Sequence, residues 1–549
     1  MFELIWQEYF LTLFNTISIL RGYKLDPYGI ITIIGLAVAV YATFPIEKRL
    51  DLVLRFSIFD RVIIALTLLA VHYIIYLPVL ESLGLYIYLG PWKYGFNESN
   101  TIYLMFLSLS VYIFIRIKSA KVTRSNIDTA YELFETLLLE NKYSELTLLV
   151  KKHIRSIIEI SGSRSLRNSI AGKIKPRSNF HTLLLEGKTC DEPSLSNKLM
   201  VNIYEKIVHD DKKPEVAANI LRRLVSNYGF VNYISIAQPY LGIDIIKYEN
   251  SFTRDFISGF ISCLIENPNS IYYYELENTQ NLTHGHRYYI SDNNKFLYFF
   301  LGDINIAKKF SIYKPIGDKV CFYIENDTEI SSRFNRSLGT YVDHQRFKCP
   351  IYSSMHFFDI MIMESIHNNV RWHMWLFYFV SFTKLILSKL NPSANVDLEA
   401  EWPTPYHYTI YNIITIMLRW LEESEYLADK SQLYIKNQSL SHDNGSIMKS
   451  TALALGSIVY MVINSSNITE KFKIYILEII CRYLADTKHE PLLNNLNKVL
   501  MLSILRNGVH NKHHNEYVRT LSYCFNKIDH CLIYELKDFE AFISNALME

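Results

Sequence analysis

The feature that most constrains this chain is the stretch 101–124, TIYLMFLSLSVYIFIRIKSAKVTR. An apolar run without a charged residue reaches Ile115, and basic residues follow it closely. These residues are Arg116, Lys118, Lys121 and Arg124. The pattern is typical of a last membrane-spanning helix and the cytoplasmic flank that stops it. In a chain of 549 residues, it predicts a short membrane-bound part and a large domain on one side of the bilayer.

Two earlier runs, 28–44 and 62–80, contain no Asp, Glu, Lys or Arg. At about 1.5 Å of rise per residue, each forms a helix of roughly 25 to 28 Å, which just crosses the hydrocarbon core. Together with 101–117, they predict three spans. Residues 2–20 combine a polar stripe with a broad apolar face, which fits either a helix lying in the interface or a fourth span. We therefore expect residues 1–124 to form a membrane anchor.

Basic residues near the spans predict the orientation, because cytoplasmic flanks carry an excess of Lys and Arg. The basic residues between the first two spans are Lys48, Arg49, Arg55 and Arg61. The loop 81–100, between the second and third spans, has only Lys93. The seven cysteines include no CxxC pair, which is typical of reduced thiols in the cytosol. The sequence thus predicts a multi-pass protein of the inner (plasma) membrane with its C-terminal domain in the cytoplasm.

His72 lies near the middle of the second predicted span. An ionisable group at that depth can line a pore or a proton path. It can equally be a neutral side chain that is hydrogen-bonded to a neighbouring helix. Both interpretations stay open.

A helical hairpin and a basic linker are expected over residues 125–198. Apolar residues recur at helical spacing on both sides of a polar break near Asn141, which predicts two antiparallel helices. The linker that follows, residues 161–179, has no acidic residue and carries Arg164, Arg167, Lys173, Lys175 and Arg177. Such a run can lie on anionic lipid headgroups, although a solvated loop fits as well. Nucleic acid is not an expected partner, because the net charge of the chain is only +2.

A central cytosolic domain is expected over residues 199–400. Between about 270 and 350, short runs rich in Tyr, Phe and Ile are bounded by Asn, Asp, Gly and Pro. This texture predicts a small mixed α/β or irregular insert. Residues 352–390 are apolar around most of a helical circumference, which predicts one long buried helix.

One face of that predicted helix carries polar residues. They are His356, Asp359 and His367, and Glu364 lies near them. Two imidazoles and two carboxylates can hold a divalent metal or support acid/base chemistry, and the pair Glu364 and His367 has the ExxH spacing of di-iron bundles. The sequence holds no second ExxH, so a satisfied internal network is the alternative. No cofactor is otherwise indicated.

Residues 401–549 contain helical segments that recur about every twenty residues, which predicts stacked helices of a solenoid-like kind. The apolar run 451–463 is shorter than the ~20 residues that a spanning helix needs, so we expect it to be a core helix. The expected fold class is therefore mainly α, with three or four N-terminal transmembrane helices before a large helical cytosolic domain.

No catalytic motif has the spacing that its chemistry requires, which favours a non-enzymatic function. We expect a membrane-anchored cytosolic sensor or adaptor that binds another macromolecule, for which bacterial stress or phage defence is one setting. Its expected partners are the lipid bilayer and either a protein partner or further copies of the chain. The alternatives are a gated oligomeric pore and a metal-dependent enzyme with its site on helix 352–390.

Overall fold

The computed structural model describes most of the chain beyond residue 57. The described stretches are 58–77, 98–118, 122–162, 212–249, 251–282, 287–368, 374–392, 395–423, 447–491, 493–508 and 514–548, with a few single positions outside them. The predictions for residues 2–20, for the span 28–44 and for the five basic linker residues lie outside this part. The described part is 79% helical and holds no strand, so a mainly α fold is confirmed. The chain forms two compact units, residues 1–230 and 231–549.

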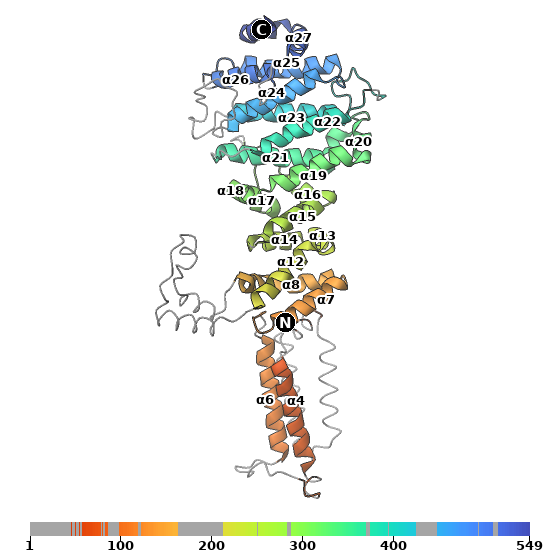
Figure 1. The fold of residues 1–549 in the computed structure, drawn as a ribbon, viewed down its shortest axis with the longest axis vertical. Helices are drawn as coiled ribbons and strands as arrows, with labels where there is room; N and C mark the ends of the chain where they lie inside the picture. The colour runs from red at the N-terminus through yellow and green to blue at the C-terminus, as the bar shows by residue number, and fades with distance from the viewer. Residues whose placement is uncertain are drawn as a thin grey trace, which may run out of the picture. The chain divides into compact units, whose positions relative to one another are not determined.

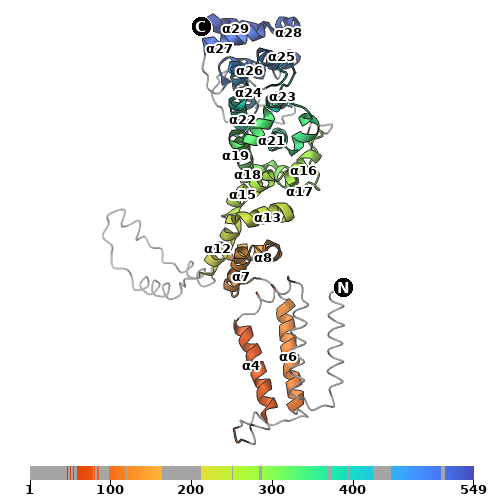
Figure 2. The same cartoon turned by 90° about the vertical axis from the view of Figure 1, so that its right-hand side faces the viewer.

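In the first unit, two long helices pack side by side (Figures 1 and 2). They are α4 (Ile58–Ile75) and α6 (Glu98–Lys118). A small core joins them, in which Val71 and Ile74 of α4 pack with Ile102 of α6. The second and third predicted spans fall largely on these two helices.

Large apolar side chains point away from this small core. Among the most exposed are Phe59, Val62, Leu66, Leu69, Leu104, Val111 and Ile115. Leu66 is 60% exposed and Ile115 is 58% exposed, although both belong to strongly apolar helices. The helix pair therefore buries one narrow seam and leaves its outer faces uncovered by the rest of the described chain.

A three-helix group completes the described part of the first unit. It consists of α7 (Ile127–Leu139), α8 (Tyr143–Gly162) and α12 (Lys213–Ser226). The turn between α7 and α8 contains Asn141 at φ 55°, a left-handed conformation that asparagine tolerates better than most residues. This residue lies at the polar break of the sequence, and α12 packs against both helices of the pair.

The second unit is built from short helices followed by longer ones. In chain order these are α14 (Pro239–Lys247), α15 (Thr253–Glu266), α16 (Ile271–Asn278), α17 (Lys295–Leu301), α18 (Ile304–Phe310), α19 (Tyr313–Asn326), α20 (Thr328–Phe334), α21 (Pro350–His367), α22 (Phe377–Lys389), α23 (Pro405–Glu422), α24 (Ile447–Asn464), α25 (Glu470–Asp486), α26 (Asn494–Leu505), α27 (Asn515–Phe525), α28 (His530–Glu535) and α29 (Lys537–Met548). The helix α13 (Tyr228–Ala237) lies at the boundary between the units.

The helices of the second unit pack in two adjacent rows (Figure 2). One row runs through α15, α19, α22, α24 and α26, each packed on the next. The other runs through α16, α21, α23, α25 and α28. Contacts between α19 and α21, and between α23 and α24, join the rows. The helices in the middle of the stack, such as α19, α21, α23 and α24, thus pack against their own row and against the opposite row.

Two expectations for the central domain are corrected. Residues 270–350 contain no strand where they are described, and most of the aromatic runs lie in α16, α17 and α19 instead, whereas residues 287–292 lie outside the helices. In α17, Phe296, Leu297, Phe300 and Leu301 are buried, a spacing that fits one face of a helix better than one face of a strand. The stretch 352–390 is not one helix, because α21 ends at His367 and α22 begins at Phe377. Asn368, whose residue type favours helix ends, follows α21 directly.

One described helix, α24, has the length and apolar composition that crossing a membrane requires, and 89% of that stretch is buried. It is surrounded by α22, α23, α25 and α26, as expected of a core helix, and it begins four residues before the apolar run 451–463. At Gly456 the helix α26 comes so close that an added Cβ would lie 2.0 Å from the Ser503 hydroxyl oxygen. Only glycine permits this spacing between the two helices.

Candidate functional site

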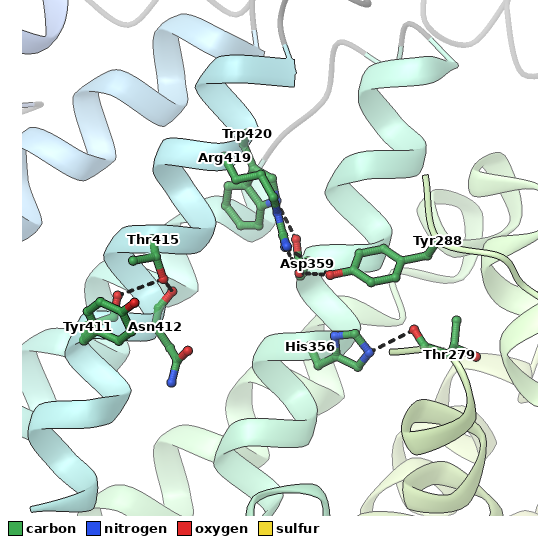
Figure 3. A network of polar contacts seen from close by, with 9 residues as sticks. All are labelled: Thr279, Tyr288, His356, Asp359, Tyr411, Asn412, Thr415, Arg419 and Trp420. Atoms are coloured by element: carbon green, nitrogen blue, oxygen red, sulfur yellow. Dashed lines mark hydrogen bonds and ion pairs between the residues drawn. The ribbon is translucent and has the colours of Figure 1, made fainter. Parts of the chain in front are cut away.

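The polar stripe of α21 meets residues from two other parts of the chain at Asp359 (Figure 3). The Tyr288 hydroxyl donates to Oδ2 of this carboxylate at 2.6 Å, and the Trp420 indole nitrogen donates to Oδ1 at 2.9 Å. Arg419 forms an ion pair with Oδ2 and also donates to the Tyr288 hydroxyl at 3.0 Å. Asp359 is only 2% exposed. A carboxylate loses its bound water when it is buried, and these donors supply hydrogen bonds in place of that water.

Two neighbouring residues of α23 supply half of this network. Burial opposes the positive charge of Arg419, but Asp359 and Tyr288 outweigh that effect and raise the Arg419 pKa. Burial also raises the pKa of Tyr288, helped by the Asp359 carboxylate, so its hydroxyl keeps its proton and donates. The network therefore joins α21, α23 and the segment before α17 through one buried, charge-paired centre.

His356 lies one turn before Asp359 on α21. Its Nε2 is 3.2 Å from the Thr279 carbonyl oxygen, and its ring packs edge-on against Tyr288 and Phe347. Burial lowers the His356 pKa, which favours a neutral ring. Because a carbonyl can only accept, Nε2 carries the proton and Nδ1 is left as an acceptor.

Glu364 lies further along the same helix and has a different partner. Arg287 donates from Nε to its Oε1 at 3.1 Å and forms a second contact to Oε2. This is the two-pronged arrangement in which guanidinium groups bind carboxylates best. The Asn368 side chain donates to the Glu364 backbone carbonyl at 2.8 Å, and His367 is the last residue of α21.

These contacts bear on the predicted metal ligands. Asp359 and Glu364 each pair with an arginine. Over the described stretches, no three His, Cys, Asp or Glu side chains are grouped so that they could hold a metal ion. A metal site on His356, Asp359, Glu364 and His367 stays a prediction. Glu364 and His367 do belong to one helix, as their spacing predicts, but Arg287 occupies the carboxylate.

The other sequence-predicted positions lie in the first unit. His72 is exposed on α4, with its ring 5.0 Å from that of Tyr76. Its predicted place in a pore is not tested by this arrangement. The lipid-facing prediction for Arg164, Arg167, Lys173, Lys175 and Arg177 falls outside the described residues.

No model of a known protein family matches this chain, and no curated protein or solved structure is similar to it. The function proposed below rests on the residues of this chain alone.

A cavity of about 350 Å³ opens beside the network. Its walls come from α21, α23, the short 3-10 turn η3 (Arg346–Lys348) and the segment around Gln280. Two arginines, Arg346 and Arg419, line it together with the rings of Tyr352 and Phe347. Neither arginine was predicted from the sequence as a site residue. One signal could have indicated Arg419. It is the only Lys or Arg of α23, and a buried Asp359 would require a cation of this kind as its partner.

Proposed function

We propose that this protein is a membrane-anchored helical adaptor or sensor whose C-terminal unit binds another protein. The anchor would comprise α4, α6 and the predicted first span, and the two helical rows would form a solenoid-like platform in the cytoplasm. The observation that carries the binding role is an exposed aromatic surface on α14, α16 and α17. The membrane role has separate support in the first unit.

The exposed apolar faces of α4 and α6 support the anchor. Soluble monomers seldom expose contiguous apolar surface of this kind, whereas lipid solvates it well. Near one end of the pair, the buried Asp60 accepts from Arg116 Nε at 2.8 Å and also contacts Tyr112. This contact and the seam at Ile102 make the helices antiparallel. Asp60 and Arg116 thus lie together where the basic flanks predict the cytoplasmic side.

The aromatic surface consists of Tyr240, Tyr274, Lys295 and Tyr298. Tyr274 is 65% exposed and Tyr298 is 52% exposed. The Lys295 ammonium lies 4.9 Å from the centre of the Tyr240 ring, and it precedes Tyr298 by one helical turn. Partial burial and Glu275 raise the Tyr240 pKa. The helices that carry Tyr240 and Tyr274, α14 and α16, both pack on α17. Tyrosines that are exposed together in this way are enriched at protein interfaces and at their energetic centres.

The adaptor role is tested with full-length protein purified from native membranes. The double variant Tyr274→Ala/Tyr298→Ala should lose the proteins that crosslink to the wild type. Tyr534→Ala is the matched control, because Tyr534 is 72% exposed on α28, outside this surface. Circular dichroism must show equal helicity in all three proteins. The same crosslinked set in the double variant as in the control would overturn the binding role.

The anchor is tested independently by extraction with alkaline carbonate. The wild-type protein should stay in the membrane pellet, and a tag after residue 549 should be protected from protease in intact cells. Release of the protein without detergent, or cleavage of the tag from outside, would overturn the anchor and its orientation.

An oligomeric pore is a second candidate, and the exposure of His72 favours it. His72 lies in the last turn of α4, and an imidazole within a span avoids lipid when it faces a water-filled path or another subunit. Ion flux through reconstituted liposomes should then be lost in His72→Leu. Monomeric protein in detergent, without flux, would exclude this candidate.

A further inference from the structure

The cavity beside Asp359 is lined by polar groups that are mostly engaged with the protein itself. The Thr415 hydroxyl donates to carbonyls of its own helix at 3.1 Å, and the Asn412 amide donates to the Tyr408 carbonyl at 3.0 Å. The His356 ring nitrogen donates to Thr279. These bonds leave the two arginines as the strongest donors that face the cavity.

Arg346 stands out because it has no carboxylate partner within 4.0 Å among the described residues. Its one hydrogen bond, to the Tyr408 hydroxyl, is long at 3.4 Å, and its buried Nε has no partner in the described part of the chain. The guanidinium lies instead over two rings, 4.9 Å from the centre of Phe347 and 5.3 Å from that of Tyr352. Such stacking orients a guanidinium and leaves its outer edge available to an anion.

Arg419, on α23, adds a second guanidinium to the lining. Its bond to Asp359 uses one terminal nitrogen, and its side chain is 30% exposed. The lining therefore holds two guanidinium groups and one carboxylate, so it carries an excess of positive charge. Planar guanidinium groups match the oxygen spacing of carboxylates and phosphates.

The size and the rings of the cavity limit what this charge can bind. A volume of about 350 Å³ is at the small end of the range for organic ligands, roughly 300 to 1,000 Å³. The rings of Tyr352 and Phe347 line the cavity beside Arg346, and the ring of Tyr288 lies beside Arg419. A bare inorganic ion would leave that surface unused, whereas a molecule with one planar ring would cover it.

We propose that the cavity between α21 and α23 binds a small organic oxyanion, with its carboxylate or phosphate on Arg346 and Arg419 and its ring against Tyr352. This site goes beyond the adaptor role and depends on neither the aromatic surface nor the anchor. A ligand here would contact both helices that Asp359 joins. Binding of this ligand would also be a signal to which a sensor protein could respond.

Binding is measured by calorimetry on full-length protein in detergent. The probes are uridine monophosphate for a phosphate, 4-hydroxybenzoate for a carboxylate, and inorganic phosphate for the bare ion. Their neutral counterparts are uridine and 4-hydroxybenzamide. At least one ring-bearing anion should bind ten or more times tighter than its neutral counterpart and than inorganic phosphate. The tighter of the two identifies the oxyanion.

Arg346→Met should weaken that binding at least tenfold, and Arg346→Lys should weaken it less. The matched control is Arg336→Met, because Arg336 is an exposed arginine outside this cavity. If Arg346→Met does not fold, the lysine variant decides the result. Absence of binding for every probe at millimolar concentration would overturn the proposal. Equal binding of neutral and charged probes, or undiminished binding in both Arg346 variants, would do the same. Membrane extraction and crosslinking of these variants should match the wild type.

Discussion

The helix α24 and the pair α4 and α6 are similar in composition and opposite in surroundings. Both are rich in Leu, Ile and Val, yet Ile458 of α24 is fully buried while Leu66 of α4 is 60% exposed. The difference comes from the neighbours, since α24 is packed among other helices of its unit and the described chain leaves the outer faces of the pair uncovered. Hydropathy alone therefore does not show whether an apolar helix is buried in a core or left exposed by the described chain. The number of protein neighbours does.

The largest expected difference between the two regions follows from placing a charge in each of them. Ile458→Asp should unfold the second unit, because an unpaired carboxylate in a dry core costs more than about 4 kcal/mol. Urea unfolding in detergent, followed by fluorescence of the buried Trp375 and Trp420, measures this effect.

The matched change is Leu66→Asp. It should leave that unfolding curve unchanged and reduce membrane integration instead, because a carboxylate facing lipid is costly. If Leu66→Asp destabilises the second unit, or Ile458→Asp does not, the two regions do not differ as described.

A smaller effect is expected at the two places where an arginine pairs with a buried aspartate. Arg419→Leu should cost the second unit about 3 kcal/mol, because Asp359 is left without a cation. Arg116→Leu removes the corresponding partner of Asp60 and should not shift the same curve. Asp359→Asn in the Arg419→Leu background should recover most of the loss. Failure of that recovery would mean that packing, and not charge pairing, dominates at this site.

Acid should weaken the second unit through His407. Burial lowers its pKa from 6.5 to about 4, so the unfolded chain binds the proton more tightly than the folded one. The stabilisation is complete above pH 6.5 and is lost as the pH falls toward 4, by about 2 kcal/mol between pH 6.5 and 5. The urea midpoint of His407→Asn should show a correspondingly flatter pH dependence over this range. An unchanged slope would count against a buried neutral imidazole.

The smallest expected difference comes from removing one methylene in each region. Ile458→Val should cost about 1 kcal/mol, because the core of the second unit cannot fully close the space. Ile115→Val, at a position that is 58% exposed, should change the stability by much less. Both changes keep the branch at Cβ, so helix propensity is matched. Equal effects, measured by thermal unfolding, would show that Ile115 is as closely packed as Ile458.

The sequence predicted the helical class because apolar spacing of three and four residues dominates the chain, and the polar break at Asn141 coincides with a turn. The prediction of a mixed α/β insert between 270 and 350 was wrong. Tyr and Phe favour strands in isolation, but burial against α21 selects helices here. The polar stripe of α21 was predicted from its own spacing. Its partners were not, since Arg419 and Arg287 lie 60 and 77 residues from the carboxylates they bind. Such pairings depend on tertiary folding and leave no local pattern.

The close approach at Gly456 has a consequence for how this chain can change over time. Apolar positions of α24 can exchange among residues of similar volume, because neighbouring side chains adjust. At position 456 the obstacle is the Ser503 hydroxyl together with the backbone of α26, and backbone cannot be repacked. The short distance between α24 and α26 thus depends on the absence of a side chain at this position. We expect this glycine to be among the slowest positions of the helix to vary in any descendant of the chain.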